Sequence, residues 1–416
     1  MSTTLDRAWR DERARIVASL ARRFADLTLA EDATQEAFAA AATAWPRTGT
    51  PDRPGAWLMT TAYRKAIGIR RKQRPTESLD EAFADVEAPT AYAGDVPGVG
   101  GGNPAAIDDD LFVLMTTCCH PALHTDARIA LTLRHVCGLT VAEIAAGFVV
   151  AEATMAKRLV RARRKILDAG IAFTPPSAED LPGRVDDVRT VVYLVFTEGH
   201  LSAGTGSAVR VDLCEEAVWL ARLLHGLDPG DAESCGLLAL LLIQHSRRAA
   251  RFDALGRLVP LLEQQRESWD RSAIDEARGL LAGAHHGHPG PRQVEAAIAL
   301  LHVAGDAPNW ARIADLYGVL ARLAPSPVVE VNRSLAVGRA DGPQAGLAVL
   351  APVLADPHMA RYAPLFAVQA DLLESSGDVA GARSAWERAA ELATNPEQVS
   401  ALRLRHNRLP HDSTGS

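Results

Sequence analysis

Two groups of residues have side chains that could bind a metal or act as nucleophiles. Cys118–His120 contains two adjacent cysteines and a histidine, and residues 285–288 contain three histidines. Adjacent cysteines rarely reach the same tetrahedral ion, and the five cysteines form no C-x-x-C pair, so neither zinc nor a disulfide framework is indicated. No Walker A, HExxH, G-x-S-x-G or dinucleotide-binding motif is present. We therefore expect no catalytic residue, no metal and no cofactor.

A third group has side chains that could bind DNA. In a helix expected at about residues 152–167, apolar residues at positions 155, 159, 162 and 166 form one stripe, and Thr154, Lys157, Arg158 and Arg161 occupy the opposite face. Arginine and lysine bind guanine edges and phosphates. We expect this helix to contact DNA, and the alternative is a basic helix that is only solvated.

The residues before this helix would hold it in place. A helix from about residue 126 ends at a Cys137–Gly138 turn. Thr140 and Glu143 then have the spacing of a capping box, in which each side chain satisfies a backbone N–H group at a helix start. A short helix over about 140–148 and a turn at 149–151 follow. This order of elements predicts a helix–turn–helix motif.

A second basic segment lies at residues 55–74 and is also expected to contact nucleic acid. Its basic residues crowd the C-terminal half, behind an apolar start, and include Arg64, Lys65, Arg70 and Arg71. The alternative is again a generic basic helix.

The helix before this segment combines a buried side with a polar patch. Thr28 and Glu31 are predicted to form its capping box, and residues 37, 38, 41 and 45 its buried side. Asp32, Gln35 and Glu36 would then share an exposed face. An acidic patch beside a basic helix suggests two different partners, and a solvated helix face is the alternative.

The 416-residue chain has a net charge of −7 that is unevenly distributed. Residues 1–75 contain 14 Lys and Arg against 8 Asp and Glu, and residues 76–107 contain six acids and no base. Abundant Ala, Leu, Arg and Glu, with few alternating β-branched runs, predict an all-α fold. Glycine and proline mark breaks at 91–106 and 173–183. The expected domains are 1–75, 108–172 (the helix–turn–helix) and 184–410, with a flexible acidic linker at 76–107.

The last of these domains shows weak internal repetition. The segments that start at Asp341 and Ser376 are similar at a spacing near the 34-residue tetratricopeptide period. In the second copy, Ala382, Ala385 and Ala389 would let paired helices approach closely. An irregular helical bundle is the alternative.

The two basic segments resemble regions 2 and 4 of the sigma-70 superfamily, specifically its extracytoplasmic-function group. The runs DLTLAEDATQEAFAAA and GAWL resemble region 2, and LTVAEIA and AEATMAKRLVRARRKI resemble region 4. The resemblance implies a sigma factor that binds core RNA polymerase and promoter DNA. It would not be an enzyme, because the polymerase supplies the chemistry.

The resemblance also implies residue roles. The residues that bind the polymerase β′ clamp helices would be Asp32, Gln35 and Glu36, and the β subunit would be a further contact. The loop at 46–54 would hold a base flipped from the −10 element. The residues that help to melt this element would include Arg64, Lys65, Arg70 and Arg71. The residues in the −35 major groove would be Thr154, Lys157, Arg158 and Arg161. The acidic linker would thread the polymerase cleft, with a plain tether as the alternative.

The C-terminal body resembles the subgroup that carries a tetratricopeptide-like extension. The matching runs are YLVFTEGH at 193–200, SWDRSAIDEA at 268–277, SPVVEVNRSLAV at 326–337 and TCCHPAL at 117–123. Such an extension implies a protein or peptide partner. Gly68 stands where the family has Asp, and Ala151 where many relatives have a Ser cap, so the resemblance does not fix the promoter sequence.

No apolar run approaches the roughly 18 residues of a membrane span, and the N-terminus is too charged for a signal peptide. We therefore expect a cytoplasmic protein with no membrane partner. Two other functions are compatible with parts of the pattern: a helix–turn–helix regulator that acts without polymerase, and a helical scaffold whose motif has degenerated. Binding to core polymerase would separate both from a sigma factor.

Overall fold

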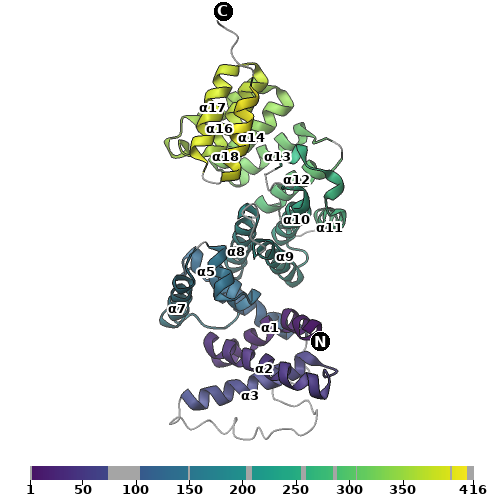
Figure 1. Cartoon of the computed structure of the whole chain (residues 1–416), viewed down its shortest axis with the longest axis vertical. Helices are drawn as coiled ribbons and strands as arrows, with labels where there is room; N and C mark the ends of the chain where they lie inside the picture. Colours follow the sequence, from purple (N-terminus) through teal and green to yellow (C-terminus); the bar gives the residue numbers. More distant parts are fainter. Residues whose placement is uncertain are drawn as a thin grey trace, which may run out of the picture. The chain divides into compact units, whose positions relative to one another are not determined.

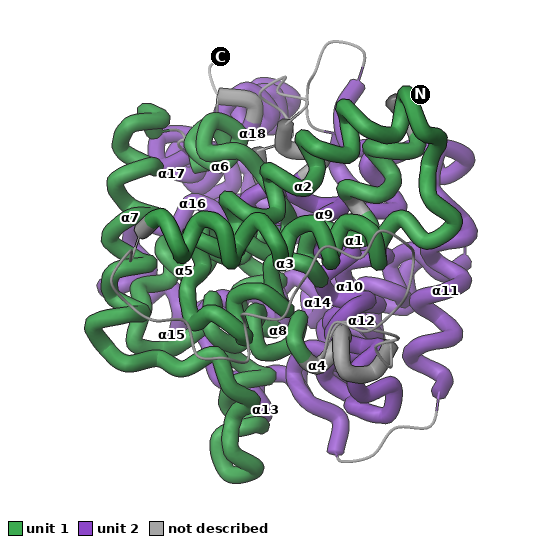
Figure 2. The backbone as a smooth tube through the Cα atoms, turned by 90° about the horizontal axis from the view of Figure 1, so that it is seen from below, with its two compact units in different colours: residues 1–195 green, residues 196–416 purple. Residues whose placement is uncertain are grey.

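The computed structural model describes residues 2–73, 104–148, 150–202, 209–253, 259–283, 288–305, 307–393 and 396–409. These residues form helices joined by turns, and none of them lies in a β-strand. The chain divides into two compact units, residues 1–195 and 196–416 (Figure 2). The predicted all-α fold is confirmed, while most of the predicted linker lies outside the described residues.

Three helices begin unit 1 (Figure 1): α1 spans Ser2–Phe24, α2 spans Leu27–Thr48 and α3 spans Pro54–Gln73. Each packs against the other two. Their shared core includes the fully buried side chains of Leu20, Ala37 and Leu58, and burial of this apolar surface holds the three helices together.

The start of α2 differs from the prediction. Its N-cap is Asp26, whose Oδ1 accepts hydrogen bonds from the backbone N–H groups of Thr28 (2.8 Å) and Leu29 (3.1 Å). Glu31 takes no part in the cap, and its side chain is buried. The predicted capping box of Thr28 and Glu31 is therefore wrong, because the cap lies two residues earlier and the Thr28 N–H group, which Glu31 would have bound, is already paired with Asp26.

The rest of unit 1 contains a second group of helices. They are α4 (Pro104–Cys118), α5 (Thr125–Leu131), the π-helical segment η2 (Thr132–Cys137), α6 (Val141–Gly147), α7 (Glu152–Asp168) and the first part of α8 (Leu181–Ser202). α4 packs against both α1 and η2. It begins at Pro104, within the stretch expected to be non-helical, because proline is well tolerated in the first turn of a helix.

Unit 2 is a succession of helices that mostly pack against their neighbours in the chain. The long ones after α8 are α9 (Val209–Leu227), α10 (Ala232–Ser246), α11 (Arg271–Ala282), α12 (Pro291–Val303), α13 (Trp310–Leu323), α14 (Pro327–Asp341), α15 (Pro343–Leu354), α16 (Ala363–Ser376), α17 (Val379–Leu392) and α18 (Pro396–Arg408). Short 3-10 helices lie at Arg248–Ala250, Leu261–Glu263, Arg266–Ser268 and Pro357–Met359.

The repetition seen in the sequence corresponds to two helix pairs. α14 and α15 meet at Gly342 (φ 101°), and α16 and α17 are separated by a turn at Gly377 (φ 86°). Within the first pair the backbones approach closely: a Cβ on Gly346 would lie 2.6 Å from the carbonyl oxygen of Ser334. The alanines predicted to allow such an approach in the second pair are all buried, namely Ala382, Ala385 and Ala389.

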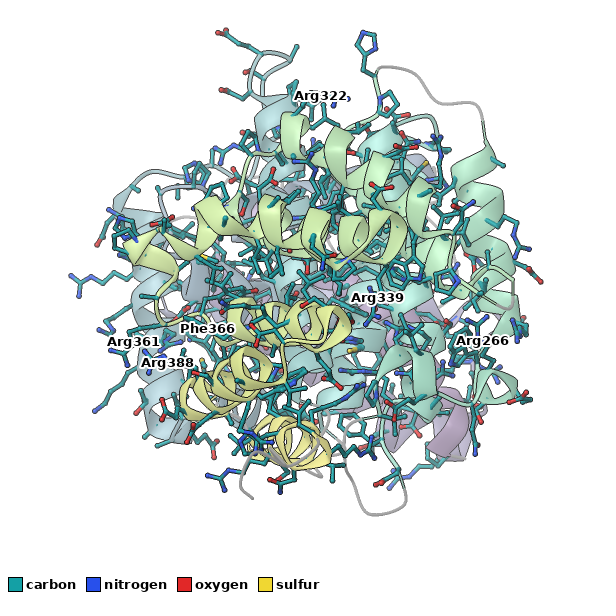
Figure 3. All side chains as sticks on the ribbon, turned by 90° about the horizontal axis from the view of Figure 1, so that it is seen from above. Arg266, Arg322, Arg339, Arg361, Phe366 and Arg388 are labelled. Carbon is teal, nitrogen blue, oxygen red and sulfur yellow. The ribbon has the colours of Figure 1, made fainter. Side chains whose placement is uncertain are left out.

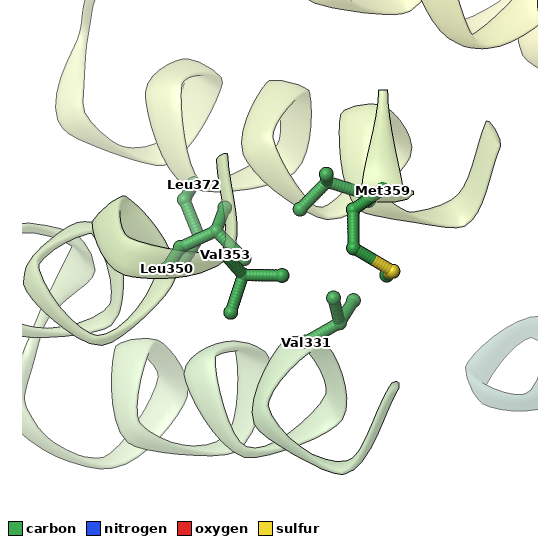
Figure 4. Packing of buried hydrophobic residues seen from close by; sticks show 6 residues of the cluster. Val331, Leu350, Val353, Met359 and Leu372 are labelled. Atoms are coloured by element: carbon green, nitrogen blue, oxygen red, sulfur yellow. The ribbon is translucent and has the colours of Figure 1, made fainter. Parts of the chain in front are cut away.

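An apolar cluster joins the two pairs. It contains Val331 of α14, Leu350 and Val353 of α15, Met359 and Leu372 (Figure 4). Because one cluster takes residues from α14, α15 and α16, it links the first pair to the first helix of the second pair, as expected for stacked helical repeats.

Candidate nucleic-acid and polymerase interface

The predicted helix–turn–helix is present in unit 1. The π-helical segment η2 ends at Gly138, which adopts a left-handed conformation (φ 84°). Thr140 and Glu143 then form the predicted capping box: Thr140 Oγ1 accepts from the Glu143 N–H (3.2 Å), and Glu143 Oε2 accepts from the Thr140 N–H (2.6 Å). α6 packs directly against α7. These caps and contacts fix the orientation of α7.

The two faces of α7 are divided as predicted. Its buried residues are Met155, Leu159, Ala162 and Ile166. The opposite face carries Thr154, Lys157 and Arg161, which are exposed. The N-cap Ala151 provides no side-chain hydrogen bond, so α7 relies on its apolar stripe for its position.

Arg158 lies in a different environment from the other three residues. Its Nη1 donates to Asp126 Oδ2 (3.1 Å), and its guanidinium lies over the Phe148 ring, 5.5 Å from the ring centroid. Only a quarter of its side chain is exposed. Asp126 therefore competes with any base or phosphate for this guanidinium.

The basic residues of α3 are also largely accessible. Arg64, Lys65 and Arg71 are exposed, whereas Arg70 is half-buried with its guanidinium 5.9 Å from the Phe24 ring centroid. At the start of this helix, Trp57 meets Trp45 of α2 edge to face, with ring centroids 5.8 Å apart. This aromatic pair packs together the two helices that flank the predicted base-holding loop. The loop is shorter than the predicted 46–54, because α2 includes residues 46–48 and α3 begins at Pro54.

The predicted polymerase-binding residues form one surface with α3. Asp32, Gln35 and Glu36 are exposed, and together with Ile69 and Lys72 they line a cleft of about 420 Å³. Glu36 Oε2 lies 3.1 Å from Lys65 Nζ. The acidic patch therefore borders the basic helix, as the sequence predicts.

A buried ionic cluster was missed by the sequence analysis. Glu31 Oε1 lies 3.3 Å from Arg13 Nη2 and 2.5 Å from Arg134 Nη2, and Glu31 Oε2 lies 3.3 Å from His135 Nδ1. Arg13 also donates to the carbonyl oxygens of His135 (3.2 Å) and Arg134 (3.0 Å). We call these four residues the ionic cluster. It connects α1 and α2 to η2 of the helix–turn–helix.

Burial dominates the electrostatics of the ionic cluster. It raises the pKa of Glu31, although Arg134 and Arg13 oppose the shift. It lowers the pKa of His135 well below its usual value, and nearby arginines lower it further. One sequence signal could have revealed the cluster: Glu31 lies on the stripe of α2 formed by positions 27, 34, 38 and 41, which is otherwise buried and free of charge. A charge on such a stripe needs a partner.

A second contact joins α7 to α2. Arg163 Nη1 donates to Thr28 Oγ1 (3.4 Å), and the Arg163 charge also lowers the pKa of Asp32, against the larger raising effect of burial. The helix–turn–helix therefore lies beside the acidic patch. We call this packing of the helix–turn–helix against α1 and α2 the closed head.

The cysteines of the possible metal-binding group are buried thiols. Cys118 and Cys119 are fully buried, and burial raises the pKa of Cys119 to about 12. Across the described ranges, no group of three or more His, Cys, Asp or Glu side chains is placed to hold a metal ion. His285 and His286 lie outside the described residues.

Two exposed basic helices, one in a helix–turn–helix and one beside an acidic patch, define a protein of the DNA-binding class. Family models match both of these parts of the chain: residues 9–76 match sigma-70 region 2, and residues 114–166 match sigma-70 region 4. Residues 184–285 match a family of unknown function, DUF6596.

An uncharacterized protein of Rhizobium meliloti (strain 1021) is 40% identical over 414 residues, which cover 97% of this chain and 96% of that protein. The chain belongs to the sigma-70 family and is a sigma factor for transcription initiation, whose regions 2 and 4 imply core RNA polymerase and promoter DNA as partners. None of the described helices is long and apolar enough to cross a membrane.

Proposed function

We propose that the chain is an extracytoplasmic-function sigma factor that directs core RNA polymerase to −35/−10 promoters. The observation that carries this proposal is the pair of exposed basic helices, α3 and α7, each held by its own buried stripe. α7 would place Lys157 and Arg161 in the −35 major groove, and α3 would act at the −10 element. The polymerase would supply the catalytic chemistry.

The proposal requires the closed head to open. A duplex rises about 3.4 Å per base pair, so elements about 25 base pairs apart are separated by roughly 85 Å. α3 has 20 residues and is about 30 Å long at about 1.5 Å per residue, and α7 contacts α2, which packs on α3. The closed head is too short to occupy both elements. We propose that polymerase binding at Asp32, Gln35 and Glu36 separates α7 from α2.

Run-off transcription tests the central proposal. Core polymerase and the full-length protein should produce specific transcripts from promoter-containing genomic fragments. Asp32→Asn combined with Glu36→Gln should weaken core-polymerase binding, while Arg161→Ala should reduce selectivity for the −35 element. Specific binding of the protein to DNA without any binding to core polymerase would favour a polymerase-independent regulator instead.

We further propose that unit 2 is a tetratricopeptide-like regulatory or interaction domain. The stacked pairs α14–α15 and α16–α17 support this proposal. Exposed cations lie on the same unit, including Arg322, Arg361 and Arg388, whose guanidinium lies 5.8 Å from the Phe366 ring centroid (Figure 3). Such side chains suit an acidic protein or peptide segment.

Truncation tests the role of this domain. The cut should fall after Val195, because Asp187 of α8 pairs with Arg128 of α5 at 3.1 Å and belongs to unit 1. Promoter output from the truncated and full-length proteins at matched cellular levels should differ several-fold. Equal output under all growth conditions would assign unit 2 no regulatory role.

A further inference from the structure

Two segments with no role in DNA or polymerase binding meet at one cleft in unit 1. The first is the end of α4 and the turn after it, within the TCCHPAL run, and the second is the chain from α7 to the start of α8. They enclose a cleft of about 340 Å³. Its polar lining consists of Thr116, Thr117, His120, Thr174, Ser177, Asp180 and Arg184. Its size is within the range of small-molecule sites.

A residue that lines the cleft carries an unsatisfied cationic donor. Arg184 Nη1 is buried and has no hydrogen-bond partner among the described residues. The nearby carboxylate of Asp187 is occupied by Arg128, whose Nη1 lies 3.1 Å from Asp187 Oδ1. Buried polar groups in folded proteins are nearly always paired. Arg184 also lines the cleft, so a rotation of its side chain toward the cleft would let this guanidinium pair with a ligand that carries an acceptor.

A second donor lies in the same cleft. His120 Nδ1 accepts a hydrogen bond from the backbone N–H of Ala122 (3.1 Å), so the proton of the neutral ring is on Nε2. Burial lowers the pKa of His120, and the charges of Arg184 and Arg128 lower it further. Both effects favour the neutral ring, which can donate from Nε2 to an anion.

One acceptor completes the polar lining. Asp180 is exposed, and its Oδ2 accepts from the Ser177 hydroxyl at 2.7 Å, which leaves further lone pairs free to bind a donor. A carboxylate at this position repels a doubly charged phosphate more than a singly charged carboxylate. It also favours a ligand that carries a hydroxyl or amino group.

We propose that this cleft binds a small hydroxy- or amino-carboxylic acid. The ligand's carboxylate accepts hydrogen bonds from Arg184 and His120 Nε2, and its hydroxyl or amino group donates to Asp180. At about 30 Å³ per water molecule, the cleft holds roughly eleven water volumes, which matches a metabolite of about ten non-hydrogen atoms. The site goes beyond the proposed sigma-factor function and does not depend on it.

The position of the cleft gives such a ligand a regulatory consequence. One wall precedes the helix–turn–helix, and the other leads into α8, which continues into unit 2. Ligand contacts to both walls would fix the start of α8 relative to α4. Metabolite concentration would thereby act on the segment that joins the promoter-binding unit to the C-terminal unit.

Titration calorimetry on the full-length protein without polymerase tests the site, with L-malate, L-glutamate, succinate and inorganic phosphate as probes. Malate or glutamate should bind saturably at about 1 mM or below, more tightly than succinate or phosphate, and should shift the His120 imidazole resonances. Arg184→Gln removes a charge-assisted hydrogen bond and should weaken binding about ten- to a hundredfold. Arg184→Lys should retain part of the affinity.

Arg189→Gln is the matched control, because Arg189 lies on the same helix, pairs with Asp186 and does not line the cleft. This variant should bind like the wild type. The proposal is overturned if neither malate nor glutamate binds, or if Arg184→Gln binds them as tightly as Arg189→Gln does. Because polymerase is absent, either result is independent of transcription activity.

Discussion

Replacement of Glu31 by glutamine should open the head of this sigma factor. The carboxylate contacts Arg13 and Arg134 at 3.3 and 2.5 Å and lies 3.3 Å from His135. Glutamine has nearly the same shape but no charge. Two guanidinium groups would then remain beside a neutral side chain, and Arg13 is buried with 3% of its surface exposed.

The expected loss is large because the ionic cluster is buried. Removal of one partner from a buried ion pair costs about 3–5 kcal/mol. At about 1.4 kcal/mol per factor of ten, the closed head would be disfavoured by roughly two to four powers of ten. The same substitution at Glu36 is the control: its pair with Lys65 is about half exposed, and such pairs contribute about 0–1 kcal/mol.

Energy transfer between two fluorophores would report the opening. One is placed at Thr48, at the end of α2, and the other at Ala151, just before α7, because both positions are exposed and can be labelled. Glu31→Gln should lower the transfer efficiency without polymerase, and core polymerase should lower it in the wild type. Glu36→Gln should leave it unchanged in the free protein. If Glu31→Gln keeps wild-type transfer and loses less than about 1 kcal/mol in urea unfolding, the cluster does not hold the head closed.

Three further predictions concern individual residues. Asp126→Asn should release Arg158 and tighten binding to the −35 element, measured by footprinting against a scrambled element. Gly236→Ala should destabilise unit 2 by about 1–3 kcal/mol, because the added Cβ would lie 2.5 Å from the Gln293 backbone nitrogen. Gly226→Ala, where the Cβ would meet open space, should instead stabilise unit 2 by about 0.4–1 kcal/mol. Denaturant titrations would measure both changes. Burial lowers the pKa of His302 to about 4. The contribution of the neutral ring to the free energy of unfolding is therefore complete above about pH 6.5. It is lost as the pH falls toward 4, at up to about 1.4 kcal/mol per pH unit. His302→Gln should flatten that dependence in unfolding measured from pH 7 to pH 4.5.

Short-range patterns determined the parts that the sequence predicted correctly. The capping box of Thr140 and Glu143 spans four residues, and the apolar stripe of α7 repeats with the period of one helix. Both depend on backbone geometry within a few turns, so they hold in any tertiary context. The helix pairs that start near residues 341 and 376 were visible for the same reason.

The capping error at α2 shows where local pattern is insufficient. Thr28 and Glu31 have the correct spacing for a capping box, but Asp26 is also a strong cap and lies where the chain turns after α1. The two caps compete for the Thr28 N–H group, which Glu31 would bind in a capping box and which Asp26 binds in the structure. Glu31 was then free to enter the ionic cluster.

The contacts that govern the proposed mechanism could be seen only in the folded chain. Arg13 and His135 are 122 residues apart, and Arg163 and Thr28 are 135 apart. Sequence periodicity assigns each residue to a face of its helix, but it does not state which faces meet. The sequence therefore determined two basic helices, each with an apolar buried side, and a helical extension. The tertiary structure decided that the helix–turn–helix packs against α1 and α2 around the ionic cluster. The reason is that a buried charge needs a partner, and only the fold brings these partners within reach.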